Sequence, residues 1–142
     1  MTDFKHGRVV ANGLEFEYLE AGEGPLALCM HGFPDTPFTY RHLLPVLAEP
    51  GFHAVAPFVR GFAPTQLPPL RHHIHTSVMV ADQIALAGAL GGGPDAVLLA
   101  HDWGAVGAWG ALSRAPHLWG RSIIMNIPPF EIFGENLSTY PQ

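Results

Sequence analysis

The chain has 142 residues, which is long enough for one domain with a hydrophobic core and short for two. Apolar residues make up 48% of it and charged residues only 13%, a composition that excludes an intrinsically disordered chain. Seven Lys and Arg against twelve Asp and Glu give a formal net charge of -5, so a basic surface for nucleic acid is not expected.

The first predicted elements are strands. Residues 9–11 and 14–18 flank the pair Asn12-Gly13, which accepts the positive φ of a tight hairpin turn. The run over 26–30 is apolar on both faces, as a buried parallel strand is. The chain is therefore expected to open with an antiparallel pair and then enter a parallel sheet.

Helices and strands alternate through the rest of the chain, the pattern of right-handed βαβ units. This pattern predicts an α/β fold class with a doubly wound, mostly parallel sheet. The expected elements are a helix over 36–48, a strand over 53–57, a proline-rich connection over 59–75, a helix capped by Thr76 or Ser77 and ending near Leu90, a strand over 96–100, a helix from Gly104 onward and a strand over 121–127.

The sequence favours one unit over residues 1–127, followed by a tail over 128–142. No predicted element follows to pair with the last strand, so residues 122–126 are expected to form an open sheet edge with unpaired backbone groups. Such an edge can pair with a second copy of the chain. We therefore expect possible partners to include the chain itself.

The expected compartment is the cytoplasm. The single cysteine, Cys29, has no second cysteine for a disulfide, which fits a reducing environment. Residues 1–6 lack the apolar stretch of a signal peptide. No uninterrupted apolar run approaches the roughly 20 residues of a membrane helix, so no membrane partner is expected.

A strand-to-helix corner presents an acidic residue. In open α/β sheets, ligands bind at the carboxyl ends of the strands, and His101-Asp102-Trp103-Gly104 lies at such an end. A sharp corner of this kind exposes the side chain at its tip and requires small neighbours, which Ala100 and Gly104 provide. A plainer interpretation is that Asp102 only caps the helix, because aspartate is a favoured N-cap residue.

A second motif favours a catalytic interpretation. Residues 31–34, His-Gly-Phe-Pro, end the neighbouring strand, and their turn can direct the amide of Phe33 to the place where the amide of Trp103 also points. Two such amides form an oxyanion hole.

With both motifs the chain resembles an α/β-hydrolase, and their combination looks like the epoxide hydrolase branch of that family. Arg60-Gly61-Phe62 is similar to the family's Arg-Gly-aromatic turn, and the helical run ending near Leu90 precedes the strand that carries Asp102. The resemblance covers almost the whole chain. It implies the N-terminal part of an α/β-hydrolase fold, with residues 128–142 as the start of the cap connection or a disordered tail.

The resemblance implies that Asp102 is the nucleophile and that the amides of Phe33 and Trp103 are the oxyanion donors. A carboxylate is ordinarily ionised at neutral pH and needs no base to attack a saturated carbon. The implied substrates are therefore small-molecule epoxides or alkyl halides, and no cofactor is expected. Substrate binding is expected at His31, Gly32, Pro34 and Trp103.

The family's catalytic histidine, its usual acid and its cap-domain tyrosines find no match in this chain. Asn126 stands where some relatives carry an alternative acid, and Glu131 is a poor substitute. His31 and His101 flank the proposed pocket, but neither is expected to be the general base. The isolated chain is thus expected to undergo at most one slow alkylation of Asp102 per molecule.

Three alternatives remain. A haloalkane dehalogenase would share Asp102 and Trp103, although Phe33 stands where that branch tends to place a halide-binding asparagine. A non-catalytic fragment that pairs through its last strand is the second. The third is a metal site at His72, His73 and His75, but short histidine tracts in loops are usually solvated, so no metal is predicted.

Overall fold

The computed structural model describes residues 4–66 and 75–129, and their strands form one sheet. The strands are β1 (Lys5–Ala11), β2 (Leu14–Ala21), β3 (Leu26–Met30), β4 (His53–Pro57), β5 (Val97–His101) and β6 (Arg121–Met125). Their order across the sheet is β1-β2-β4-β3-β5-β6. The first pairings, β1 with β2 and β2 with β4, are antiparallel, and the remaining pairings are parallel.

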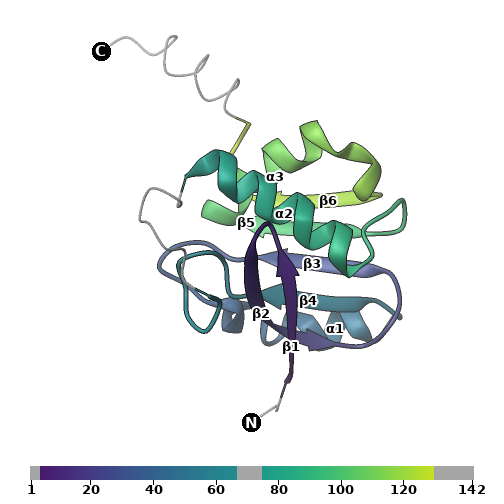
Figure 1. Ribbon diagram of the computed structural model, residues 1–142. Helices are drawn as coiled ribbons and strands as arrows, with labels where there is room; N and C mark the ends of the chain where they lie inside the picture. The colour runs from purple at the N-terminus through teal and green to yellow at the C-terminus, as the bar shows by residue number, and fades with distance from the viewer. Residues whose placement is uncertain (1–3, 67–74, 130–142) are drawn as a thin grey trace.

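Helices lie on both faces of this sheet. The α-helices are α1 (Leu43–Ala48), α2 (Thr76–Leu90) and α3 (Trp103–Arg114), and short 3-10 helices cover Pro37–Tyr40 and Pro116–Leu118. Figure 1 shows α2 and α3 side by side, with α1 at a distance from them near β4. The predicted α/β class with a doubly wound, mostly parallel sheet is therefore confirmed.

Each face of the sheet has its own core, because side chains alternate along a strand. On β3, Leu26, Leu28 and Met30 pack in the cluster that includes residues of α2 and α3. Ala27 and Cys29 pack in the cluster that includes α1. Burial raises the pKa of the Cys29 thiol to about 12, which keeps the thiol protonated and unreactive.

The opening hairpin forms as predicted, with its turn at Asn12 and Gly13. Both residues have positive φ, 44° and 75°, the backbone that this pair accepts. The turn is fixed to the rest of the molecule because the side chain of Asn12 donates to Oδ1 of Asp82 on α2 at 2.7 Å.

The prediction of one helix over 36–48 is wrong. A 3-10 helix ends at Tyr40 and α1 begins only at Leu43. Pro45 accounts for the break, because it has no N–H to bond back to Arg41 and is tolerated only in the first turn of a helix. The predicted cap of α2 is also wrong: His75, in an extended conformation, caps the helix by accepting from the amide of Ser77 at 3.3 Å.

The last strand is shorter than predicted. β6 ends at Met125, and Asn126 follows with a φ of 61°, a left-handed conformation that stops the strand. Within the described residues, β6 pairs only with β5 and lies at one end of the sheet order. Whether this edge is open beyond the described residues, as predicted, stays a prediction. The division between 1–127 and 128–142 stays a prediction, because 130–142 lie outside the described residues.

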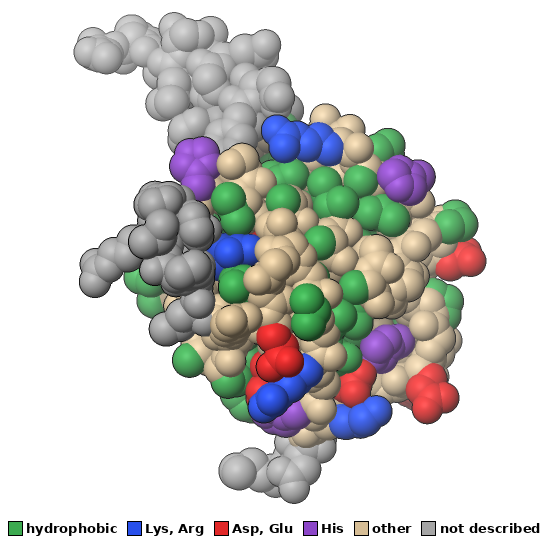
Figure 2. All heavy atoms as spheres, in the orientation of Figure 1, with side chains coloured by type: hydrophobic (Ala, Val, Ile, Leu, Met, Phe, Trp, Pro, Cys, Tyr) green, Lys and Arg blue, Asp and Glu red, His purple; other side chains and the backbone are tan. Residues whose placement is uncertain are grey.

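On the face drawn in Figure 2, positively and negatively charged side chains lie next to one another toward the lower end. Among the exposed ion pairs, Lys5 contacts Glu20 at 3.0 Å and Arg8 contacts Glu17 at 3.2 Å. In the part of the chain that the structure describes, none of the helices is long and apolar enough to cross a membrane.

Candidate active site

Asp102 occupies a strained corner between β5 and α3. Its φ of 51° and ψ of -124° lie outside the regions that residues with a side chain ordinarily adopt. Asp102 is at the N-cap position of α3, yet its side chain makes no capping hydrogen bond. The interpretation of Asp102 as only a helix cap is therefore not supported by its contacts. The corner instead presents the carboxylate at the carboxyl end of the sheet.

Two glycines make room for this corner. A side chain at Gly104 would collide with the carbonyl of Met30, at the end of β3. A side chain at Gly32 would collide with the side chain of Asp102 itself. The turn after β3 and the corner after β5 are thus packed directly against each other, as expected for neighbouring parallel strands.

A hydrogen bond joins the two predicted motifs. The backbone N–H of Phe33 donates to Oδ1 of Asp102 at 2.8 Å. Trp103 is the first residue of α3, and an N–H in the first turn of a helix has no acceptor within the helix. Within the described residues, Oδ2 of Asp102 makes no hydrogen bond, so one carboxylate oxygen is held and the other is available.

The backbone of the corner is held by Asn126. Oδ1 of Asn126 accepts from the amide of Asp102 at 3.0 Å. This position follows β6, whose last residue, Met125, is the register partner of His101. Sequence reasoning treated Asn126 only as the place of a missing acid and did not predict this contact. The predicted parallel pairing of the last two strands was the signal that could have placed Asn126 beside Asp102.

His31 stabilises the turn that carries Phe33. Its side chain is fully buried, Nδ1 lies 2.9 Å from the carbonyl of Gly32, and Nε2 lies 3.2 Å from the amide of Val59. These partners assign the neutral tautomer in which Nδ1 donates and Nε2 accepts. Burial lowers the pKa of His31, against the smaller opposing effect of the Gly32 carbonyl. Both ring nitrogens are engaged within the protein.

His101 lies beside other polar groups near the corner. Its Nε2 is 3.8 Å from Oδ2 of Asp35, and its ring is 5.7 Å from that of Tyr40. The hydroxyl of Tyr40 donates to the carbonyl of Met30 at 2.9 Å, and burial raises the pKa of that hydroxyl. No histidine in the described residues hydrogen-bonds the carboxylate of Asp102.

Two aromatic rings stand beside the carboxylate. The ring of Phe33 stacks on that of Trp103, with centroids 4.9 Å apart and planes 22° apart. Phe33 is 56% exposed and Trp103 40%, so this stack is an apolar surface open to solvent. The ring centroids of Phe62 and Phe33 lie 6.2 Å apart, with the ring planes 67° apart. An apolar substituent brought to Asp102 would meet this surface.

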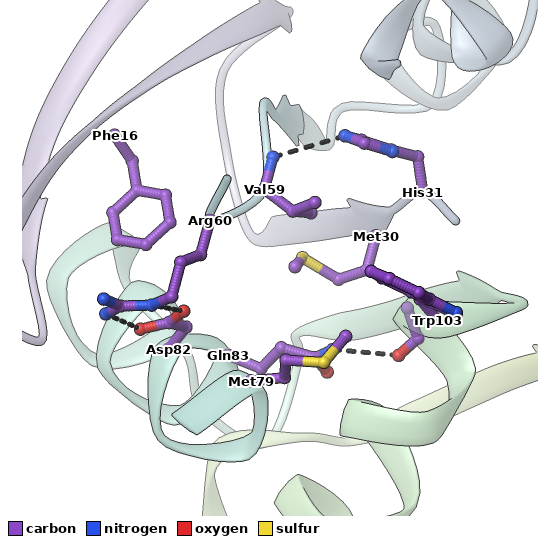
Figure 3. A pocket seen from close by; sticks show the side chains of 10 residues that line it. Phe16, Met30, His31, Val59, Arg60, Met79, Asp82, Gln83 and Trp103 are labelled. Carbon is purple, nitrogen blue, oxygen red and sulfur yellow. Dashed lines mark hydrogen bonds and ion pairs between the residues drawn. The ribbon is translucent and has the colours of Figure 1, made fainter. Parts of the chain in front are cut away.

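A small apolar cavity lies between Trp103 and α2 (Figure 3). The centre of a water molecule can occupy about 20 Å³ within it. Of the residues predicted to bind substrate, His31 and Trp103 line this cavity and Gly32 and Pro34 do not. The cavity is lined by Phe16, Met30, His31, Val59, Arg60, Met79, Asp82, Gln83, Trp103 and Gly104.

The Arg-Gly-aromatic turn contributes a buried ion pair. Arg60 donates to both carboxylate oxygens of Asp82 on α2, from Nε at 2.7 Å and from Nη2 at 2.6 Å. Nη2 also donates to the carbonyl of Asn12 at 3.3 Å. These contacts join three segments beside the cavity: the opening hairpin, the turn after β4 and α2. Sequence reasoning identified the turn but not Asp82, its partner on α2.

The histidine tract that was weighed as a metal site lies mostly outside the described residues. His72 and His73 lie outside the described residues, and His75 caps α2. Among residues 4–66 and 75–129, no three histidine, cysteine, aspartate or glutamate side chains come together in a way that suits a metal ion.

Comparisons with known proteins agree with this geometry. The alpha/beta hydrolase fold family matches residues 25–140. Epoxide hydrolase 1 of Siraitia grosvenorii is 38% identical over 109 residues, which are 77% of this chain and 34% of that protein. An epoxide hydrolase of Caballeronia sordidicola is 36% identical over 123 residues, 84% of this chain and 36% of that protein. The chain thus spans about a third of the length of these relatives.

Solved structures give the same result. The crystal structure of an epoxide hydrolase from Vigna radiata superposes with a TM-score of 0.83 at 34% identity, covering 89% of this chain and 39% of that one. Potato (Solanum tuberosum) epoxide hydrolase I gives a TM-score of 0.78 at 35% identity, covering 86% and 39%. The family profile matches most of its length and the fold agrees, so the chain belongs to the alpha/beta hydrolase fold family; the relatives and solved structures named above, to which it is similar, are epoxide hydrolases.

Proposed function

We propose that Asp102 is the nucleophile of an epoxide hydrolase-type reaction. The observation that carries this proposal is the hydrogen bond at 2.8 Å from the Phe33 amide to Oδ1. That bond orients a carboxylate whose other oxygen, Oδ2, has no hydrogen-bond partner in the described part of the chain. Orientation of a reacting group is a major source of rate enhancement.

In the first step, Oδ2 attacks a carbon of the epoxide. A bond forms between Oδ2 and that carbon, the carbon–oxygen bond of the ring breaks, and its electron pair goes to the departing oxygen. That oxygen takes a proton from solvent, and the product is a hydroxyalkyl ester of Asp102. The stacked rings of Phe33 and Trp103, centroids 4.9 Å apart, favour epoxides with an apolar or aromatic substituent.

In the second step, water attacks the ester carbon and charge develops on Oδ1. The amide of Phe33 already lies at that oxygen, and the amide of Trp103 is the proposed second donor. A donor of this kind contributes about 3 kcal/mol to the tetrahedral intermediate. Collapse of the intermediate releases the diol and restores the carboxylate.

We expect the second step to be slow in the 142-residue chain. It requires a base to remove a proton from water, and both ring nitrogens of His31 are engaged by Gly32 and Val59. No other histidine in residues 4–66 and 75–129 hydrogen-bonds Asp102. The alkyl ester should therefore persist long enough to be detected.

Intact-mass spectrometry after incubation with styrene oxide tests this proposal. The expected result is one added epoxide mass per chain in the native protein and none in Asp102→Asn. Circular dichroism of the variant checks that it folds. If the folded native chain gains no mass, or if Asp102→Asn gains the same mass, the proposal is overturned.

Halide chemistry is the second candidate, because Trp103 follows Asp102 and its indole N–H can face a leaving halide. The neighbouring side chain at position 33 is a phenyl ring stacked on the indole, which offers no second halide donor. Incubation with a brominated alkane, followed by halide titration, separates the two reactions. Halide release together with inertness toward styrene oxide would favour the dehalogenase type.

A further inference from the structure

We propose that Gln83 is a positioning residue for the Asp102 corner, an inference that rests on the proposed function. Gln83 is on α2 and is 1% exposed. Its Nε2 donates to the carbonyl of Gly104 at 2.8 Å, in the first turn of α3 and two residues after Asp102. Figure 3 shows this contact crossing from α2 to the start of α3 beside the cavity.

The start of α3 is held from two sides. On one side Gly104 contacts the carbonyl of Met30 so closely that a side chain would not fit. On the other side the amide of Gln83 binds the Gly104 carbonyl. A reacting group must be held within about 0.5 Å of its productive position, so a contact that prevents α3 from shifting affects the reaction directly.

Gln83 lowers the stability of the fold compared with an apolar residue at this position. Its Oε1 is buried and has no hydrogen-bond partner in the described residues. An unsatisfied buried polar atom lowers the stability of the fold, and an apolar side chain of the same shape would avoid that loss. The assignment of the two amide atoms is fixed by the contact, because the Gly104 carbonyl requires a donor.

A neighbouring glycine gives the Gln83 amide its space. A side chain at Gly107, one turn further along α3, would collide with Nε2 of Gln83. The next glycine, Gly110, faces Val80 instead, and a side chain there would collide with Val80. The same helix interface therefore has one polar contact beside the corner and one apolar contact away from it. Val80→Ala is a matched control for a change at Gln83.

The test compares Gln83→Met with Val80→Ala. Alkylation of Asp102 by styrene oxide is followed at several concentrations, which separates the maximal rate from the half-saturating concentration. For Gln83→Met we expect an unfolding free energy equal to or above that of the native chain, a maximal rate lowered about tenfold, and an unchanged half-saturating concentration. Val80→Ala should lower stability and leave the maximal rate of the folded chain unchanged.

Gln83→Glu supplies a second readout. Burial raises the pKa of a carboxyl; the protonated form can donate to the Gly104 carbonyl, whereas the ionised form cannot. The maximal alkylation rate of this variant should therefore fall as the pH rises, over a range in which the native rate is constant. The inference is overturned if Gln83→Met alkylates at the native rate, if Val80→Ala slows the reaction equally, or if Gln83→Glu shows the native pH profile.

The role of Gln83 can also be tested if the proposed reaction does not occur. If the native chain forms no ester, the amide proton shift of Phe33 in an NMR spectrum still reports the hydrogen bond to Asp102. We expect Gln83→Met to move that shift and Val80→Ala to leave it in place. An unmoved shift in Gln83→Met would overturn the inference without reference to any reaction.

Discussion

The amide of Phe33 and the carboxylate of Asp102 lie 69 positions apart in the chain and are joined by a hydrogen bond of 2.8 Å. The contact links the end of β3 to the corner after β5, and it distinguishes the two carboxylate oxygens. Oδ1 is held by the amide and becomes the carbonyl oxygen of the proposed ester. In the proposed reaction, Oδ2 is the atom that attacks.

Gly32→Ala should abolish most of the reaction. The new methyl group would occupy the space of the Asp102 side chain, so the carboxylate must move away from the Phe33 amide. A misplacement of about 1 Å costs on the order of 100-fold in rate, and we expect a loss of this size in the alkylation of Asp102.

Gly88→Ala is the control for that variant. Nothing lies within 4 Å of a side chain at this position on α2, so the alkylation rate should not change. Because alanine is favoured over glycine inside a helix, the control should be slightly more stable than the native chain. Equal alkylation rates in Gly32→Ala and Gly88→Ala would contradict the proposed role of the Phe33 contact.

Asp82→Ala should destabilise the fold. The substitution leaves the guanidinium of Arg60, whose side chain is 6% exposed, buried without its carboxylate. Removal of one partner of a buried ion pair costs about 3 to 5 kcal/mol, which urea unfolding can measure.

Replacement of both partners separates the cost of the unpaired charge from the value of the pair. The double variant Arg60→Met with Asp82→Leu should recover much of the lost stability, because neither charge remains buried. If Asp82→Ala unfolds at the native urea concentration, the network does not hold the hairpin against α2.

Local patterns in the sequence predicted the elements that depend on local chemistry. β3 and β4 occupy the predicted residues, and α2 ends at the predicted Leu90. The helix over 36–48 failed because apolar spacing outweighed Pro45 in the prediction. The motif that contains Asp102 was also predictable from the sequence. Like β3 and β4, it is defined by a few adjacent residues.

The remaining site residues contact partners that are distant in the sequence, and local sequence patterns do not predict such contacts. Asn126 reaches the amide of Asp102 only because β6 lies beside β5. Gln83 reaches Gly104 only because α2 packs on α3. In the sequence Asn126 follows an apolar strand and Gln83 follows Asp82 in a mostly apolar helix, and the partner of each depends on the topology.

Stability should fall as the pH drops below about 6.5, and His31 should be the cause. Burial lowers the pKa of His31 in the folded chain from the ordinary value of 6.5. Below that value the unfolded chain takes up a proton that the folded chain does not, so stability is complete above pH 6.5 and is lost below it. The slope contributed by one group is at most about 1.4 kcal/mol per pH unit.

His31→Gln tests the origin of this slope. Glutamine does not titrate, so the unfolding free energy of the variant should be lower overall and flatter between pH 6.5 and 4.5. Carboxylates with a lowered pKa, such as Glu17 and Glu20, contribute only below their ordinary value of 4.5. A native slope in His31→Gln would assign the effect to another group.

Two copies of the chain should pair through β6. In the described residues this strand has one partner, β5, and its side chains Ile123 and Met125 are 52% and 39% exposed. Unpaired strand edges template the addition of another strand, and charged residues suppress it. Ile123→Lys should therefore reduce the association that sedimentation velocity detects at high concentration.

Val10→Lys is the matched control for association, because Val10 is 70% exposed on β1, at the other end of the sheet order. This variant should associate as the native chain does. A compact native monomer at high concentration, or equal loss of association in both variants, would contradict pairing through β6.

Peptide mapping of the alkylated protein tests the central claim most directly. After incubation with styrene oxide, tryptic digestion places Asp102 in a peptide that runs from His72 to Arg114, and fragmentation locates the added mass within it. The proposed reaction predicts the mass on Asp102, formed once per chain and persistent at neutral pH. An adduct on a histidine of that peptide with Asp102 unmodified, in a chain that is folded, would contradict the assignment of Asp102 as the nucleophile.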